Sequence, residues 1–229
     1  MAKRRQAGLQ VSSINRQLEV VRRMLRLAVE WGDVEKQLPQ VRKIPGENHR
    51  ERVLTPEEEA SYLNAAPPLL KQVATLLIDT AMRPEECFRL KQENHRDGAL
   101  HIFRGKTTSA RRVIPLSERS IAILEARHKD ATAEWVFPAP TRSGHIEKSS
   151  LKKQHLKACA RAGIEQFPLY TLRHTCLTRW ARTMDPYTLA HVAGHSDFAM
   201  TKRYVHPQAE AVRDAMDRAQ VNCRQVVAR

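Results

Sequence analysis

The chain has 229 residues, enough for one domain of ordinary size together with a fragment of a second. Lysine and arginine number 39 against 25 acidic residues, and the formal net charge of +14 at pH 7 favours a polyanionic partner, either nucleic acid or an anionic membrane surface. No apolar run approaches the roughly 18 to 20 residues that a spanning helix needs, and no secretory signal begins the chain, so we expect a cytoplasmic protein rather than a membrane protein.

The N-terminal part predicts one helix and a linker. Apolar side chains recur at steps of three and four over residues 12–31, which indicates an amphipathic helix with arginines on its other faces. Such a helix cannot bury its own stripe and must pack on the main domain, on a partner or on helices absent from this chain. Residues 33–53 contain Pro39, Pro45 and Gly46 without periodicity, which indicates a basic linker, either a solvated connector or a strap along a phosphate backbone.

The main domain is expected to begin at residue 54 and to consist mostly of helices. Thr55 and Glu58 form a capping box around Pro56, which predicts a helix to about Asn64. Further helices are expected at residues 68–80, 84–90, 118–129, 149–161, 171–184 and 186–194, at a short stretch ending near Tyr204, and from Pro207 to about Ala219.

Two short strands complete the expected fold. Residues 99–104 and 111–116 are partly β-branched and flank the polar, basic segment 105–110, which predicts a hairpin. Residues 135–138 form a short apolar run, which we interpret as an edge strand or a plug of the core. The fold class is therefore α+β, predominantly α-helical, with a small antiparallel sheet.

The cysteines and histidines do not indicate a metal site. The four cysteines are far apart without C-x-x-C spacing, and we interpret them as reduced thiols of an intracellular protein. His191 and His195 are four residues apart, but Gly194 lies between them and no glutamate follows His191 as the zinc-protease motif requires. We expect neither a metal ion nor another cofactor.

Several cationic side chains and one tyrosine suit chemistry on a DNA phosphodiester. Cleavage without a metal needs fixed cations at the nonbridging oxygens, a nucleophile in line with the leaving group, and a proton for the leaving 5′ oxygen. Arginine suits the first role because its planar fork binds phosphate at two points. The candidates are Arg83 with Glu86 three residues on, Arg173 at a helix start, Lys106 at the hairpin tip, Arg112 on the next strand, His195 after a helix-ending glycine, and Tyr204 beside Lys202 and Arg203.

Each candidate also has an ordinary structural interpretation when it is taken alone. Tyr204 suits a half-buried core tyrosine. Arg83 with Glu86 suits a surface ion pair, and His195 suits a helix-end histidine bound to a carbonyl. These alternatives stay open for the single residues.

Together the candidates form four motifs that resemble those of the tyrosine recombinases, the phage-integrase family. The family pattern T-G-x-R-x-x-E-L is similar to Thr80-Ala81-Met82-Arg83-Pro84-Glu85-Glu86-Cys87, and Lys106 follows Arg83 by 23 residues, ahead of Arg112-Val113-Ile114-Pro115-Leu116. The box H-x-L-R-H-T is similar to Tyr170-Thr171-Leu172-Arg173-His174-Thr175. The box L-G-H-S…T…Y-x-H is similar to Ala193-Gly194-His195-Ser196 with Thr201, Tyr204 and His206, and Tyr204 follows His195 by the usual nine residues. The resemblance covers residues 54 to 206.

The resemblance implies a site-specific DNA recombinase or integrase that acts in phage or mobile-element integration and excision. It would cleave and rejoin DNA through a 3′-phosphotyrosine intermediate, without metal or ATP. The implied catalytic residues are the nucleophile Tyr204, the phosphate clamp Arg83 and Arg173, the proton donor Lys106, and His195, which binds the phosphate or assists proton transfer. The accessory candidates are Tyr170 and Glu86, and the DNA-binding candidates are Arg112, Lys202 and Arg203.

The resemblance also implies partners and a division of the chain. The partner would be a double-stranded recombination site, bound by a homo-tetramer in the cytoplasm of a bacterial cell or phage-infected host, with no membrane involved. Residues 1–32 would be the terminal helix of a truncated core-binding domain, 33–53 the interdomain linker and 54–229 the catalytic domain.

Two departures from the family pattern favour an alternative. Tyr170 stands where the family has histidine, and a phenol donates a hydrogen bond but does not act as a base near neutral pH. One predicted helix precedes the linker, where family members carry a bundle of several. The alternative is therefore a catalytically impaired DNA-binding remnant of an integrase, and a type IB topoisomerase, which shares the chemistry, is a third hypothesis.

Overall fold

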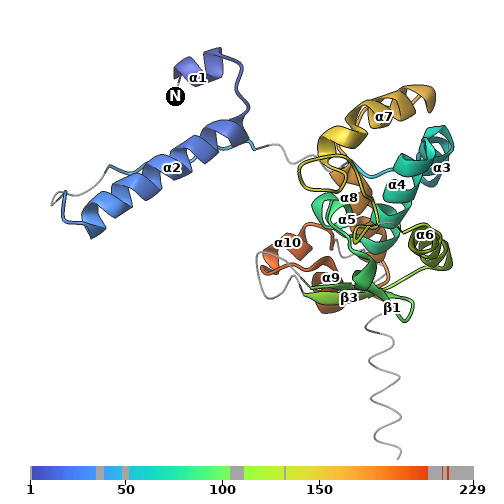
Figure 1. Ribbon diagram of the computed structural model, residues 1–229. Coiled ribbons are helices and arrows are strands. Elements are labelled where there is room, and N and C mark those ends of the chain that lie inside the picture. The colour runs from blue at the N-terminus through green and yellow to red at the C-terminus, as the bar shows by residue number, and fades with distance from the viewer. Residues whose placement is uncertain are drawn as a thin grey trace, which may run out of the picture. The chain divides into compact units, whose positions relative to one another are not determined.

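The computed structural model describes residues 2–34, 39–47, 52–103, 111–131 and 133–205, together with Arg213 and Met216. The chain divides into two compact units, Met1–Glu51 and Arg52–Arg229, of which the first is blue in Figure 1. We describe each unit by itself.

The first unit is a long helix with an extended segment folded against it. The predicted helix 12–31 is confirmed as α2 (Val11–Glu30), and a short helix that the sequence did not predict, α1 (Ala2–Gln6), precedes it. Asn15 on α2 is buried, and its amide accepts from the Ile44 backbone N–H at 2.7 Å and donates to the Ile44 carbonyl at 2.8 Å. One side-chain amide therefore satisfies both polar groups of a peptide in the predicted linker, as a neighbouring strand would.

The second unit carries the remaining described helices in the predicted order. They are α3 (Pro56–Ala65), α4 (Pro68–Thr80), α5 (Pro84–Phe88), the 3₁₀ turn η1 (Gln92–Asn94), α6 (Glu118–Lys129), α7 (Lys148–Arg161), α8 (Tyr170–Trp180), α9 (Pro186–Ala193) and α10 (Ala199–Lys202). The capping box at the start of α3 is confirmed, since Thr55 Oγ1 accepts from Glu58 N at 3.2 Å and Glu58 Oε2 accepts from Thr55 N at 3.1 Å.

One predicted helix is shorter than expected, and another lies almost wholly outside the described residues. The predicted helix 171–184 ends earlier, at Trp180, because Arg182 and Thr183 donate to carbonyls three residues back and tighten the chain into turns. The predicted last helix, from Pro207 to about Ala219, lies outside the described residues except for Arg213 and Met216, which are helical.

The sheet is antiparallel and has one more strand than the sequence predicted. Its order is β1 (His95–Arg96), β2 (Ala99–Ile102) and β3 (Arg112–Pro115), with Leu100 opposite Ile114 in the buried register. Asp97 and Gly98 join β1 to β2, and both have positive φ, 50° and 69°. Asp-Gly is the residue pair that a tight hairpin turn of this kind favours, so the sequence did carry the signal. The predicted tip of the other hairpin, 105–110, lies outside the described residues.

The central helix α4 organises the core of the second unit. Leu70, Val73, Leu76 and Leu77 of α4 have no exposed surface, and the helix packs against α8. Val136 and Phe137 are buried and belong to this core without joining the sheet, which fits the predicted core plug. In Figure 1, α9 and α10 lie beside the sheet, at the end of the unit away from α7. Arg173, in the first turn of α8, hydrogen-bonds the carbonyls of Ala81 and Ala193, so the ends of α4 and α9 meet the start of α8.

Candidate active site

Three arginines converge on the C-terminal end of α9. Three consecutive carbonyls there, those of residues 192–194, each accept from a different guanidinium. The bonds are Arg112 Nε to Val192 O at 2.7 Å, Arg173 Nη2 to Ala193 O at 2.8 Å, and Arg83 Nη2 to Gly194 O at 2.9 Å. The last carbonyls of a helix lack intrahelical donors and lie at the negative end of its dipole. The carbonyls at the end of α9 can therefore bind three cationic side chains.

Gly194 allows this approach. It ends α9 in the left-handed conformation with φ of 65°, where a side chain is strained. A Cβ at this position would lie 2.8 Å from Nη1 of Arg112 and 3.1 Å from its Cζ. Glycine is thus required both by the turn and by the arginine packed against it.

Arg173 is held by two helix ends. It lies in the first turn of α8 with 0% exposure, and its Nη1 donates to the carbonyl of Ala81, which ends α4. Nη2, besides its bond to Ala193, lies 3.2 Å from Nε2 of His195. Its Nε has no partner among the described residues. The guanidinium is therefore fixed in place before any ligand binds.

Glu86 joins Arg83 to Arg112. Its Oε1 accepts from Arg83 Nη1 at 2.9 Å, and its Oε2 accepts from Arg112 Nη2 at 2.7 Å. Burial works against ionisation of Glu86, but its hydrogen bonds and attraction to Arg112, with those to Arg83, outweigh it and keep the pKa below the usual value. The pair Arg83–Glu86 is thus part of a shared network rather than a lone surface ion pair.

Arg112 lies on β3, as the sequence predicts, but its side chain is buried. It was predicted to contact DNA, but its side chain has 0% exposure and its guanidinium is engaged with Glu86 and Val192. Such burial does not fit a direct contact with DNA. Lys202 and Arg203, the other two DNA-binding candidates, are exposed.

His195 is neutral and its tautomer follows from its partners. Arginine can only donate, so Nε2 of His195 accepts from Arg173 and the ring proton lies on Nδ1, which donates to Thr201 Oγ1 at 2.9 Å. Burial, and then the charges of Arg173, Arg83 and Arg112, lower its pKa to about 4. Thr201 was quoted within a motif but given no role.

Tyr204 lies against this cluster of side chains. It is 9% exposed and packs with Leu189 and Cys176, so the description as a buried tyrosine also holds. Its ring centroid is 6.1 Å from that of His195 and 5.0 Å from that of His174. Burial raises its pKa, and nearby Tyr170 adds to this, while the arginines oppose it. His174 was not predicted as a site residue, although it directly follows Arg173.

The remaining candidates lie at the margin or outside the described residues. Tyr170 is 42% exposed, and the Cζ of Arg173 lies 5.9 Å from its ring centroid. Lys106 and His206 belong to stretches that the structure does not describe. Within the described ranges, no helix is long and apolar enough to cross a bilayer, and no three His, Cys, Asp or Glu residues are grouped to hold a metal ion.

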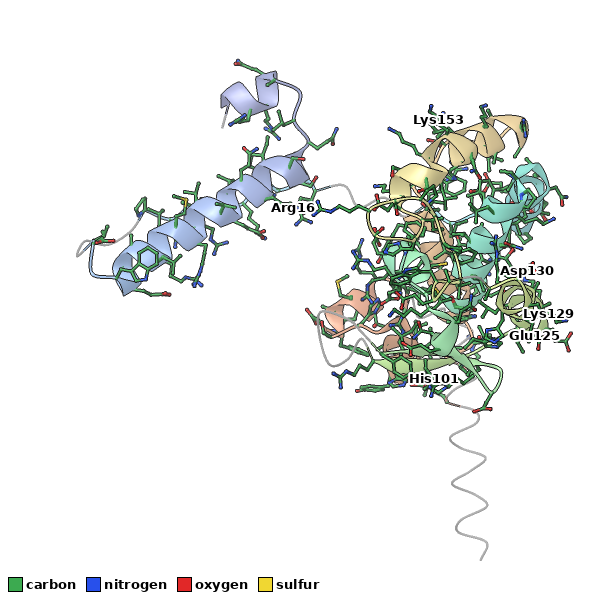
Figure 2. All side chains as sticks on the ribbon, in the orientation of Figure 1. Arg16, His101, Glu125, Lys129, Asp130 and Lys153 are labelled. Carbon is green, nitrogen blue, oxygen red and sulfur yellow. The ribbon has the colours of Figure 1, made fainter. Side chains whose placement is uncertain are left out.

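A basic surface lies on α7. Its exposed cationic residues are Lys148, Lys152, Lys153, Lys157 and Arg161. Figure 2 shows Lys153 projecting away from the body of the unit, whereas the labelled residues of α6 and its end, Glu125, Lys129 and Asp130, carry both signs of charge. A run of cations on one helix face is the pattern expected of a surface that meets phosphates.

Lowering the pH from 7 to 5 is expected to destabilise the fold through His195. The pKa of His195 in the folded chain, about 4, lies below the ordinary 6.5. Between pH 7 and pH 5 the unfolded chain therefore binds a proton that the folded chain does not, and the free energy of unfolding decreases as the pH is lowered. In urea titrations at the two pH values, His195→Asn should show a smaller drop in the unfolding midpoint than the wild type. Burial lowers the pKa of His155 as well, so part of the drop remains. An equal drop in both proteins would contradict a neutral His195.

Two solved structures illustrate the fold. The integrase of transposon Tn1549, solved with a circular intermediate DNA, superposes with a TM-score of 0.79 at 18% identity, covering 95% of this chain and 82% of that chain. A lambda integrase dimer bound to a COC′ core site gives 0.68 at 18% identity, covering 86% and 59%. The predicted fold class, a mainly helical α+β domain with a small antiparallel sheet, is confirmed.

Curated relatives match in sequence. Tyrosine recombinase XerD of Rhizobium meliloti (strain 1021) is 30% identical over 148 residues, which are 61% of this chain and 47% of that protein. The shufflon-specific DNA recombinase of Escherichia coli is 30% identical over 189 residues, 79% of this chain and 47% of that protein. The integrase of Escherichia phage P2 is 27% identical over 220 residues, covering 94% and 61%. The chain thus spans about half the length of the first two relatives.

A family model matches as well. The model described as the phage integrase family covers residues 52–211. This match spans the second unit from its first residue to beyond Tyr204, and so includes the three arginines, His195 and Tyr204. The resemblance stated from the four motifs is therefore confirmed, and this chain belongs to the phage integrase family of tyrosine recombinases.

Proposed function

We propose that the chain carries the catalytic part of a site-specific DNA recombinase that cleaves and rejoins DNA through a phosphotyrosine link. The observation that carries the proposal is the gathering of Arg83, Arg173, His195 and Tyr204 around the end of α9. These residues lie on four separate segments, and two of the arginines are fixed by backbone carbonyls. Preorganised cations of this kind stabilise charge that develops on a phosphoryl group.

In the proposed step Tyr204 attacks the scissile phosphate. The bond from its phenolic oxygen to phosphorus forms, and the bond from phosphorus to the 5′ oxygen breaks. The phenolic proton leaves to a base, and the 5′ oxygen receives a proton, in our proposal from Lys106. The energy of the broken ester is retained in the phosphotyrosine, so a second 5′ hydroxyl can reverse the step and no ATP or metal is needed.

The local charges favour His195 as the acceptor of the phenolic proton. Its low pKa in the free protein results from burial and from the arginine charges around it. A bound phosphate would offset those charges and raise the pKa towards its ordinary value, which makes a better base. In the free protein the unprotonated Nε2 accepts from Arg173, and in our proposal it exchanges that hydrogen bond for the phenolic proton. Substrate binding would therefore prepare the base.

Tyr170 fits an accessory role in the same site. Its exposed ring lies next to the guanidinium of Arg173, and its hydroxyl can donate to a phosphate oxygen. In this proposal Tyr170 contributes a hydrogen bond at this corner of the site.

We propose double-stranded DNA as the partner, bound by a homo-tetramer. Lys202 and Arg203 beside Tyr204, with the basic face of α7, would meet its phosphates. A lambda integrase has been solved as a tetramer bound to a Holliday junction. Residues 1–32 would then act as the terminal helix of a core-binding domain, 33–53 as linker and 54–229 as catalytic domain, in a cytoplasmic protein.

Binding to duplex DNA is expected to weaken steeply with salt, because phosphate contacts release counterions. Lys153→Gln should reduce the slope of log K against log salt concentration by about 1, measured by fluorescence anisotropy. Lys129→Gln on α6 is the matched control, since both lysines are exposed and labelled in Figure 2. Equal slopes for the two variants would contradict a contact between α7 and the DNA phosphates.

The alternative from the sequence, a DNA-binding remnant without cleavage, rests on Tyr170 in place of the usual histidine, and the relatives do not favour it. The test is a suicide substrate, a duplex nicked near the scissile phosphate so that the cleaved end diffuses away. The proposal expects a protein–DNA adduct that survives denaturant and whose tryptic peptide carries the nucleotide on Tyr204. Binding without any adduct would favour the remnant, and relaxation of supercoiled plasmid would favour a topoisomerase.

A further inference from the structure

The charge of Arg112 is fully enclosed, although a role in contacting DNA would leave it outside. Its side chain has no exposed surface, and its contacts include Glu86 and the carbonyl of Val192. A buried charge is costly unless it is paired and hydrogen-bonded. Arg112, on β3, is therefore a buried charge next to the candidate active site, and its burial is costly without these partners.

Both oxygens of Glu86 are shared between two arginines. Oε1 accepts from Arg83 Nη1 at 2.9 Å and from Arg112 Nη1 at 3.2 Å. Oε2 accepts from the Arg83 backbone N–H at 2.8 Å and from Arg112 Nη2 at 2.7 Å. One carboxylate therefore fixes the side chain and the backbone of Arg83 at the same time, and it does so while bound to Arg112.

The same two arginines are joined a second time through α9. Arg112 donates to Val192 O and Arg83 donates to Gly194 O, two residues apart on one helix end. The two guanidiniums, Glu86 and the end of α9 thus form a closed ring of contacts. Arg83 is the more exposed of the two arginines: 34% of its side chain is accessible, against 0% for Arg112.

The charges in this ring explain why a second cation is useful. Arg83 and Glu86 alone would form a neutral pair, which attracts a phosphate weakly. Arg112 satisfies the carboxylate from the other side, so the ring keeps a net positive charge and Arg83 remains available. Gly194 closes the packing, since a Cβ there would lie 2.8 Å from Arg112 Nη1.

We propose that Arg112 is a positioning residue for strand cleavage, which acts by holding Glu86 and the end of α9 so that Arg83 faces the phosphate with its charge uncompensated. The proposal rests on the proposed function. It assigns no contact with DNA to Arg112, so it separates the rate of cleavage from the affinity for DNA.

The test compares Arg112→Met and Arg112→Lys with the wild type in single-turnover cleavage of a suicide substrate at saturating protein. Loss of one preorganised donor typically slows a reaction by about 10²-fold or more, and we expect about this loss for methionine and roughly tenfold for lysine, with DNA affinity unchanged. Arg96→Met, which removes an exposed cation from β1 of the same sheet, is the control and should cleave at the wild-type rate.

A substrate with a methylphosphonate at the scissile position gives a readout that a merely structural role would not change. A neutral phosphoryl group develops less negative charge for the arginines to stabilise. The cleavage rates of the variants on this substrate should therefore lie within about threefold of the wild-type rate. Equal slowing on both substrates, or wild-type rates on the phosphodiester, would overturn the proposal. If the methionine variant lacks a cooperative unfolding transition, the lysine variant decides by the same criteria. Absence of any adduct from the wild type would instead refute the proposed function.

Discussion

Replacing Tyr204 by phenylalanine is expected to abolish the covalent protein–DNA adduct. The substitution removes the hydroxyl that we propose attacks phosphorus and leaves the ring beside His174 and His195. Because the ring fills the same volume beside Leu189 and Cys176, the folded state should be preserved. The measurement is adduct formation on a nicked duplex, read on a denaturing gel, with thermal unfolding recorded alongside.

Tyr187→Phe is the matched control for this variant. Tyr187 is 78% exposed and stacks on Phe198. It lies in the first turn of α9, whereas the arginines bind at the other end of that helix. Its variant should form adduct at the wild-type rate. An adduct of equal yield from Tyr204→Phe would refute the assignment of the nucleophile. Loss of the adduct in Tyr170→Phe, with retention in Tyr204→Phe, would move that role to Tyr170.

Arg173→Lys is expected to slow cleavage by about 10²- to 10³-fold, the scale for removing a preorganised donor. A lysine keeps the charge, but its ammonium lacks the planar fork that reaches the Ala81 and Ala193 carbonyls from one group. The ammonium cannot donate to both of these carbonyls and also direct further N–H groups at the phosphate. The measurement is the single-turnover rate at saturating protein, at a temperature where the variant is folded.

The control for Arg173→Lys is the same substitution at Arg182. Arg182 is exposed after the end of α8, so Arg182→Lys should leave the rate unchanged. DNA affinity of Arg173→Lys should stay close to that of the wild type, because the proposed interface would make most of its phosphate contacts through other residues. A rate within about threefold of the wild type would show that the fork of Arg173 is not needed, against the expectation for such a donor.

Local sequence signals predicted most of the helices because they depend on neighbouring residues. The capping box at Thr55, the proline starts of several helices and the apolar spacing in α4 need no distant partner. The strand β1 was missed although Asp97-Gly98 carried the signal of a tight turn. The early end of α8 was missed because nothing nearby in sequence marks it.

The sequence by itself determined the family and singled out the candidate reactive side chains. Spacing along the chain sufficed to single out Arg83, Arg173, His195 and Tyr204, since a motif is a local pattern. Their gathering around one helix end required the tertiary structure, because Arg83 and Gly194 are 111 residues apart in sequence. The role of Arg112 also depended on it. A lone arginine on a strand suggests a surface contact, and only the packing of β3 against α9 places it behind Glu86, where its charge is buried and paired.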